Sequence, residues 1–210
     1  GPTQESLDPV RYLTNHSSGK MGYAIAKMAM LRGAEVTLVS GPTALEPPLF
    51  VKYVPITTAR EMYEAVTAVS DAQDIIIKAA AVADYRPASI SDQKIKKSDQ
   101  DLSIALERTD DILKYLGAHK HPGQFLCGFS METENMLANS RAKLEKKNLD
   151  MVAANNVKVA GAGFQGDTNV LTLITKDNDV SLPLMSKEDA AMKLLDQILQ
   201  LQKEEGRTEG

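Results

Sequence analysis

The stretch at residues 74–84, DIIIKAAAVAD, decides the fold class of this chain. It starts as a continuous apolar run. Such runs are typical of strands that helices cover on both faces of a parallel sheet. The sequence therefore predicts a buried parallel strand that begins near Asp74.

Helical and strand patterns alternate on both sides of this strand. A capping box at Thr58 and Glu61 opens one helix, and Ser186 with Asp189 opens the last one. Thr109 is the predicted cap of a short helix. Predicted helices span residues 19–32, 59–69, 109–116, 134–147 and 187–203, and predicted strands span residues 35–40, 50–56, 74–84, 102–107, 124–130, 150–157 and 169–175.

This alternation predicts an α/β fold with a doubly wound, mostly parallel sheet, and a single domain over residues 1–210. Ligands of such folds bind at the carboxyl ends of the strands. We therefore expect a site among the loops at residues 14–22, 79–87, 108–111 and 129–135.

Composition narrows the function classes. The chain has 210 residues, is 43% hydrophobic and 25% charged, and carries a net charge of −4, so we expect a globular protein and no general nucleic-acid binder. No apolar run reaches the length of a membrane span, and no secretory signal is visible. With one cysteine, Cys127, we expect a cytoplasmic protein. The start at Gly1 suggests that a strand or a domain precedes it in the native protein.

The turn at residues 14–22, TNHSSGKMG, is the first candidate site. It fails the P-loop pattern and the G-x-G-x-x-G fingerprint. Ser17 or Ser18 could still cap the following helix, while Gly19 and Gly22 let an anion approach the backbone N–H groups there. An ordinary capped helix is the alternative explanation.

Lysines form the second group of candidates. The run Lys94 to Lys97, KIKK, lies in a polar segment at residues 85–100, which could be a mobile lid or a solvated face. Lys143 and Lys147 share one helix face, where they could also be ordinary surface charges. Cys127 is predicted to be buried filler.

The segments GPTQESLDPVRYLTNHSSGKMG, AAAVADYRP and KIKK together resemble phosphopantothenate–cysteine ligases, most closely the ligase domain of bacterial bifunctional coenzyme A biosynthesis proteins. The resemblance extends over essentially the whole chain, through GFSMET, KKNLDMVAANNV and NVLTLIT. It implies a Rossmann-like three-layer sandwich, a homodimer, and native fusion to an upstream flavin-dependent decarboxylase that would hold the FMN.

The resemblance also implies a reaction. CTP, with Mg²⁺, activates the carboxylate of 4′-phosphopantothenate as an acyl-cytidylate and pyrophosphate leaves. The amine of L-cysteine then attacks the acyl carbon and CMP leaves. Use of CTP rather than ATP rests on the bacterial character of the first segment.

Site residues carry over from the resemblance one by one. Asn15 falls on the catalytic asparagine, Lys94 on the lid lysine, and Ala80 and Ala81 on the small residues that face the acyl phosphate. The implied nucleotide contacts are Lys78, Ala79, Ala80, Asp84, Lys94, Asp110, Asp111, Ile112, Leu113, Phe129, Lys143 and Lys147. Asp110 replaces an expected proline, and Lys78 replaces a smaller residue. Magnesium ligands are not assigned.

Two other functions compete with the ligase. An NAD(P)-dependent reductase would use the same fold, but the glycine fingerprint is incomplete. The pair Tyr23 and Lys27, which resembles that of short-chain dehydrogenases, lies inside the first helix, where it could do no acid–base work. A nucleotide-binding regulatory module without chemistry is the third possibility.

Overall fold

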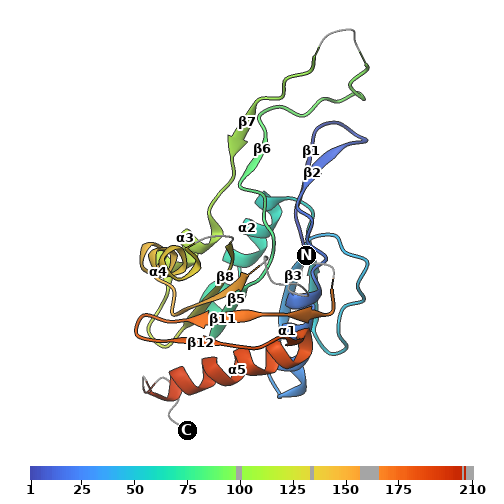
Figure 1. The fold of residues 1–210 in the computed structure, drawn as a ribbon. Coiled ribbons are helices and arrows are strands. Elements are labelled where there is room, and N and C mark those ends of the chain that lie inside the picture. The colour runs from blue at the N-terminus through green and yellow to red at the C-terminus, as the bar shows by residue number, and fades with distance from the viewer. Residues whose placement is uncertain (98–100, 133–134, 157–165, 205, 207–210) are drawn as a thin grey trace.

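The protein is a mixed α/β structure in a computed structural model that describes residues 1–97, 101–132, 135–156, 166–204 and 206 (Figure 1). Its largest sheet has five strands in the order β12-β11-β9-β8-β5. The strands are β5 (Ile75–Lys78), β8 (Phe125–Glu132), β9 (Met151–Asn156), β11 (Leu171–Ile174) and β12 (Asp179–Ser181).

The direction of these strands corrects one expectation. Strands β5, β8 and β9 run parallel, as predicted, but β11 is antiparallel to both β9 and β12. The prediction of a mostly parallel sheet is therefore wrong for this half. A parallel partner needs a crossover of a dozen residues or so, whereas a tight turn at Thr175 and Asn178 joins β11 to β12.

A separate parallel pair lies next to this sheet. Strand β3 (Thr37–Ser40) pairs with β4 (Lys52–Pro55), with Leu38 opposite Tyr53. Neither strand is hydrogen-bonded to the five-stranded sheet within the described residues.

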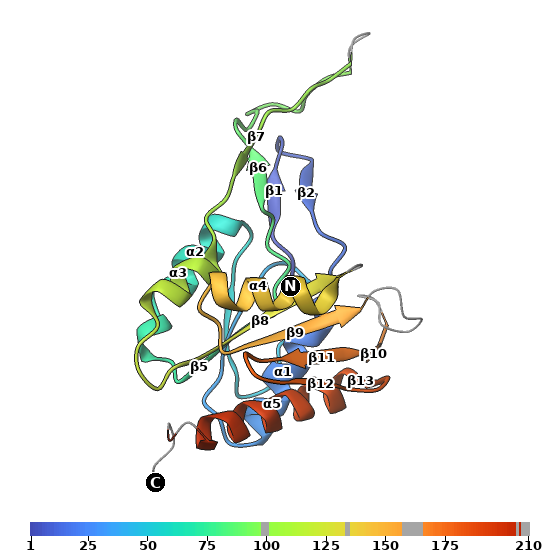
Figure 2. The same ribbon diagram turned by 60° about the vertical axis from the view of Figure 1, so that its left-hand side comes forward.

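Helices cover both faces of the five-stranded sheet (Figures 1 and 2). Helices α1 (Lys20–Leu31) and α5 (Lys187–Glu204) pack on one face. Helices α2 (Ala59–Thr67), α3 (Ile112–His119) and α4 (Met136–Lys146) lie on the other. Alternation along the strands produces two apolar clusters, since Cys127 faces the first layer of helices and Leu126 faces the second.

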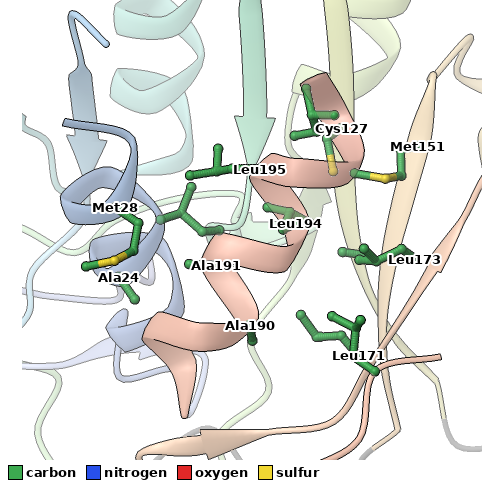
Figure 3. Close-up of a cluster of buried hydrophobic side chains, with 14 of the residues drawn as sticks. Ala24, Met28, Cys127, Met151, Leu171, Leu173, Ala190, Ala191, Leu194 and Leu195 are labelled. Atoms are coloured by element: carbon green, nitrogen blue, oxygen red, sulfur yellow. The ribbon is translucent and has the colours of Figure 1, made fainter. Parts of the chain in front are cut away.

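The larger cluster lies between the sheet and helices α1 and α5. Figure 3 shows Leu194 of α5 between the strand residues Met151 and Leu173 and helix α1, where Ala24 and Met28 lie. Met151 and Leu194 are fully buried. The predicted burial of Cys127 is confirmed, and burial raises the pKa of its thiol to about 12, so the thiol is unreactive at neutral pH.

An arm projects from the body near the amino-terminal half (Figures 1 and 2). It consists of the antiparallel strands β6 (Tyr85–Pro87) and β7 (Leu106–Arg108) with the connection between them. Beside it lies the hairpin of β1 (Gln4–Ser6) and β2 (Tyr12–Thr14). The predicted exposed segment at residues 85–100 belongs to this arm, except that residues 98–100 lie outside the described part.

The remaining short elements are a 3₁₀ turn at Ser70–Ala72 and the antiparallel pair of β10 (Thr168–Asn169) and β13 (Met185–Ser186). No helix in the described ranges is both long and apolar enough to cross a membrane.

Of the caps predicted for α2, α3 and α5, two are present. The capping box of Thr58 and Glu61 is present, and the Ser186 hydroxyl accepts from the N–H of Asp189 at 3.0 Å. Thr109 does not cap α3, because its hydroxyl donates to the carbonyl of Ala83 at 2.6 Å. The carboxylate of Asp111 caps α3 instead, accepting from the N–H of Lys114 at 3.0 Å.

Candidate active site

A cavity of about 350 Å³ lies at the carboxyl ends of β5, β8 and β9. This is the edge where the strand pattern places the ligand of an α/β sheet. The predicted site residues that line the cavity are Asn15, Ser17, Ser18, Gly19, Gly22, Lys78, Ala79, Ala80, Ala81, Asp84, Phe129 and Lys143.

The glycine-containing turn forms one wall of the cavity. Gly19 is the N-cap residue of α1 and has a φ of 78°, in the left-handed region that favours glycine. Neither serine is the N-cap residue, contrary to the prediction. Instead, the Ser17 hydroxyl accepts from the N–H of Gly19 at 3.3 Å and the Ser18 hydroxyl from that of Lys20 at 3.5 Å. The serines therefore hold the turn in shape directly before the helix.

The loop after β5 forms the facing wall. Asn15 donates from Nδ2 to the carbonyl of Ala81 at 3.1 Å, and the N–H of Thr3 donates to the same carbonyl at 3.2 Å. The Thr3 hydroxyl in turn accepts from the N–H of Ala83 at 3.0 Å. These bonds fix the amide of Asn15 beside the alanines.

Lysines give the cavity a positive charge. Lys20, Lys78, Lys143 and Lys187 line it, and Asp84 is the one acidic residue among its described lining residues. Burial, with a smaller effect of the Lys143 and Lys147 charges, lowers the pKa of Lys78 to about 8. Such a group is held in an unfavourable charged state until an anion binds near it.

The other three lysines are held in place by acceptors. Lys143 donates from Nζ to the carbonyl of Phe129 at 2.7 Å. Lys20 pairs with the exposed carboxylate of Asp167 at 2.6 Å. Lys187 donates to the carbonyl of Gly166, and burial lowers its pKa.

Asn155 and Lys187 are two of the lining residues that the sequence analysis did not assign to the site. Asn155 of β9 is 8% exposed, and its Oδ1 is the one buried side-chain polar atom in the described ranges without a hydrogen-bond partner. Buried Lys187 is the other. The signal for Asn155 was present in VAANN, where an amide follows a buried apolar strand at the carboxyl edge of the sheet. For Lys187 the sequence showed only the capping box at the start of α5.

Several predicted nucleotide contacts lie away from the cavity lining. The side chains of Ile112 and Leu113 are each 2% exposed within the α2–α3–α4 cluster, so only their backbone could contact a ligand. Asp111 and Lys147 form an ion pair at 2.9 Å. Both contribute to the electrostatic environment of Lys78, which connects them to the cavity indirectly.

Lys94 lies on the projecting arm and is exposed. The next residue along, Ile95, donates its N–H to Asp8 at 3.1 Å and accepts from Arg11 at 2.9 Å. Asp8 and Arg11 belong to the turn of the β1–β2 hairpin. The hairpin therefore anchors the predicted lid in a position where Lys94 does not line the cavity.

A metal ion would find few protein ligands here. The described residues contain no group of three or more His, Cys, Asp or Glu side chains suited to hold one. Asp84 alone could contribute a carboxylate from the cavity wall.

A family model described as the DNA/pantothenate metabolism flavoprotein C-terminal domain matches residues 1–201. The chain belongs to this family. The match runs from the hairpin before the glycine turn to residue 201 near the end of α5, so it includes every cavity residue named above.

Relatives within this family are similar over nearly the whole chain. The coenzyme A biosynthesis bifunctional protein CoaBC of Bacillus subtilis is 48% identical over 208 residues, which are 98% of this chain and 51% of that protein. CoaBC of Escherichia coli K12 is 47% identical over 210 residues, 99% of this chain and 52% of that protein. The chain thus spans about half the length of these relatives.

Solved structures agree with the fold. The crystal structure of the C-terminal domain of CoaBC matches with a TM-score of 0.83 and 45% identity, covering 97% of this chain and 93% of that one. A Cab2 mutant in complex with phosphopantothenate-cysteine matches with a TM-score of 0.78 at 15% identity, covering 97% of this chain and 84% of that one. At that identity the Cab2 likeness shows the fold alone.

Proposed function

We propose that this chain is a ligase domain that joins L-cysteine to 4′-phosphopantothenate in coenzyme A biosynthesis, through an acyl-cytidylate made from CTP. The cavity carries the proposal, because four lysines and a helix N-terminus surround it in a family whose 45–48% identical relatives are named for this pathway. We further propose that the complete domain is a doubly wound, Rossmann-like three-layer sandwich that works as a cytoplasmic homodimer.

The phosphates of the nucleotide are assigned to the lysine side of the cavity. The amino end of α1 and the charges of Lys20, Lys78 and Lys143 all favour a polyphosphate there. Asn155 supports the assignment differently: its unpartnered Oδ1 would accept an N–H or O–H donor of the bound ligand.

The activated acyl group is assigned to the space between Asn15 and Ala80. A neutral amide donates to developing negative charge without adding a group that titrates. The small side chains of Ala80 and Ala81 leave their backbone groups accessible to the acyl phosphate. Collapse of the cysteine adduct then releases CMP, with the bond from the acyl carbon to the phosphate oxygen broken.

Magnesium fits this site only as a companion of the nucleotide. The nucleotide phosphates and water would supply most ligands, with Asp84 as the available protein carboxylate. Bound there, the ion would neutralise phosphate charge. FMN is assigned to the decarboxylase part of a longer protein and has no role in this domain.

The predicted contacts that do not line the cavity are assigned roles in conformations that bring them closer to the nucleotide. Lys94 reaches the phosphates only by movement of the arm or from the arm of a second subunit. Asp110, Asp111, Ile112 and Leu113 would contact the nucleotide through backbone groups at the start of α3, with Lys147 held beside them by Asp111.

Pyrophosphate and CMP release tests the function. With CTP and 4′-phosphopantothenate, pyrophosphate is expected, and sustained CMP release additionally requires cysteine. Asn15→Asp is expected to bind CTP normally and to lose most product formation. Normal turnover by that variant would contradict the role of Asn15.

A thermal-shift comparison separates the ligase from its rivals. Stabilisation by CTP and not by NADPH supports the ligase over a reductase. CTP binding without any turnover, by a folded chain, would favour a regulatory module and contradict the ligase.

A further inference from the structure

Thr3 is fully buried behind the cavity wall that carries Asn15, and it is not one of the described residues that line the cavity. Its N–H donates to the carbonyl of Ala81 at 3.2 Å, and its hydroxyl accepts from the N–H of Ala83 at 3.0 Å. Its carbonyl accepts from the hydroxyl of Thr14 at 2.7 Å. One buried residue therefore connects the loop after β5 to the segment that ends at Asn15.

The hydroxyl of Thr3 takes the place of a backbone carbonyl. In a parallel pair of strands, a residue donates its N–H to one residue of its neighbour and accepts, through its carbonyl, from the residue two positions further on. Thr3 bonds to Ala81 and Ala83 in this pattern, but the acceptor is its side chain. Its own carbonyl is thereby left to accept from Thr14.

The bond to Thr14 reaches the residue directly before Asn15. Thr14 is also paired with Gln4 in the β1–β2 hairpin, so the backbone that leads into Asn15 is held twice. The amide of Asn15 then donates from Nδ2 to the carbonyl of Ala81 at 3.1 Å, the same carbonyl that Thr3 uses. Because a carbonyl only accepts, this contact fixes which end of the amide faces the loop and leaves Oδ1 for the ligand.

The loop is also held from its other side. The hydroxyl of Thr109 donates to the carbonyl of Ala83 at 2.6 Å, while Thr3 holds the N–H of the same residue. The first residues of this loop, Ala80 and Ala81, are the ones assigned to the acyl phosphate. Bonds on both sides of the loop therefore determine where their backbone groups lie.

We propose that Thr3 is a positioning residue for the second step of the reaction, in which its hydroxyl holds the loop at residues 81–83, and with it the amide of Asn15, in the orientation that attack by cysteine requires. The inference rests on the proposed function. In that step the cysteine nitrogen bonds to the acyl carbon and loses one proton to solvent, and the bond from that carbon to the phosphate oxygen breaks as CMP leaves. A displacement of about 1 Å in such an arrangement can cost roughly 100-fold in rate.

Nucleotide binding should not depend on this hydroxyl. Among the described residues, the hydrogen bonds of Thr3 go to Thr14, Ala81 and Ala83, and none goes to the lysine side of the cavity. A change at Thr3 should therefore lower the rate of the second step and leave the affinity for CTP unaltered.

Thr3→Val tests the proposal, because valine keeps the branched shape and removes the acceptor of the Ala83 N–H. We expect cysteine-dependent CMP release, measured in a single turnover of preformed acyl-cytidylate, to slow roughly 10- to 100-fold, while pyrophosphate release and the Kd for CTP change less than about twofold. Thr3→Ser keeps the hydroxyl and should recover the rate to within about threefold of the unsubstituted chain.

Two further variants complete the experiment. Thr172→Val removes another buried hydroxyl, in β11 and outside the described cavity lining, and should change neither step. Thr14→Val, at an exposed residue, removes the bond to the carbonyl of Thr3 and should slow CMP release by roughly five- to tenfold. It provides the test if Thr3→Val does not fold.

Three results would overturn the proposal: normal CMP release by Thr3→Val or, if that variant is unfolded, by Thr14→Val; equal slowing by the valine and serine variants of Thr3; or a loss of CTP affinity that matches the loss of rate. The last would show that Thr3 only stabilises the fold. Absence of pyrophosphate release by the unsubstituted chain would instead contradict the proposed function itself, so the two failures are distinguishable.

Discussion

The two halves of the sheet differ sharply in burial although both are built from apolar strands. Around β8, β9 and β11, the side chains of Phe125, Met151 and Ile174 are fully buried. Around β3 and β5, the strand residues are mostly half-buried because an edge is open. The active-site cavity draws one wall from each half. One wall is therefore set by a closed core, and the other by β5, which has one unpaired edge among the described residues.

The largest difference in the free energy of unfolding is expected between alanine variants of two isoleucines, one in each half of the sheet. Ile174→Ala in β11 should lower the free energy of unfolding by about 3–4 kcal/mol, because it leaves a cavity in a closed core. Ile76→Ala in β5 should cost about 1–2 kcal/mol, because its site is already open. Urea denaturation of both variants measures the difference. Equal costs for the two variants would contradict the comparison between the halves.

A smaller effect is expected at Lys78, at the end of β5 in the cavity wall. Burial lowers its pKa to about 8, so the folded protein pays for a buried charge below pH 8, whereas the unfolded chain keeps the proton up to about pH 10.5. Lys78→Met should therefore raise the Tm by about 3–6 °C at pH 7. This advantage should shrink as the pH rises from 8 toward 10.5.

The same variant should bind CTP roughly tenfold more weakly at pH 7, because it removes a cation from the phosphate side. Lys146→Met, an exposed lysine of α4, is the control and should change neither quantity. A lower Tm for Lys78→Met with unchanged CTP affinity would show that the lysine is structural.

In the closed half of the sheet, Asn155 of β9 offers a comparable test. Replacing its unpartnered amide in Asn155→Leu should stabilise the ligand-free protein by about 1 kcal/mol, because a buried polar group without a partner is costly. CTP or substrate affinity should fall. Loss of stability with unchanged affinity would indicate a structural partner instead of a ligand.

The smallest effect is expected in the glycine turn. A Cβ on Gly22 would meet only the Cβ of Ala79 at 3.8 Å, an ordinary contact. Gly22→Ala should therefore stabilise α1 by about 0.5–1 kcal/mol and still weaken nucleotide binding, if the ligand approaches the backbone there. Gly33→Ala is the control, since its φ of 87° makes alanine unfavourable and it lies outside the cavity.

Sequence periodicity predicted most elements because each depends on local pattern, as with the capping box at Thr58 and the buried strand at Phe125. It missed the antiparallel return of β11, because strand direction depends on connection length and not on the strand's own residues. Sequence periodicity also missed the unpaired edge of β5. An apolar run indicates that a strand is buried, but it does not show which strands pair with it.

The site residues, too, were predicted correctly only where they depend on local pattern. Residues next to a predicted strand end or glycine turn, such as Asn15 and Ala80, line the cavity as expected. Ile112 was placed by resemblance alone and Lys94 by its basic run together with the resemblance, and their positions depend on the packing of α3 and on the arm. No local pattern encodes either.

A crystal structure of the chain, soaked with CTP and 4′-phosphopantothenate without cysteine, tests the central claim most directly. The account predicts an acyl-cytidylate in the 350 Å³ cavity, with phosphate near the amino end of α1 and the acyl group between Asn15 and Ala80. A nucleotide bound elsewhere on the molecule, or an unreacted pair of ligands with the phosphates far from the lysines, would contradict it.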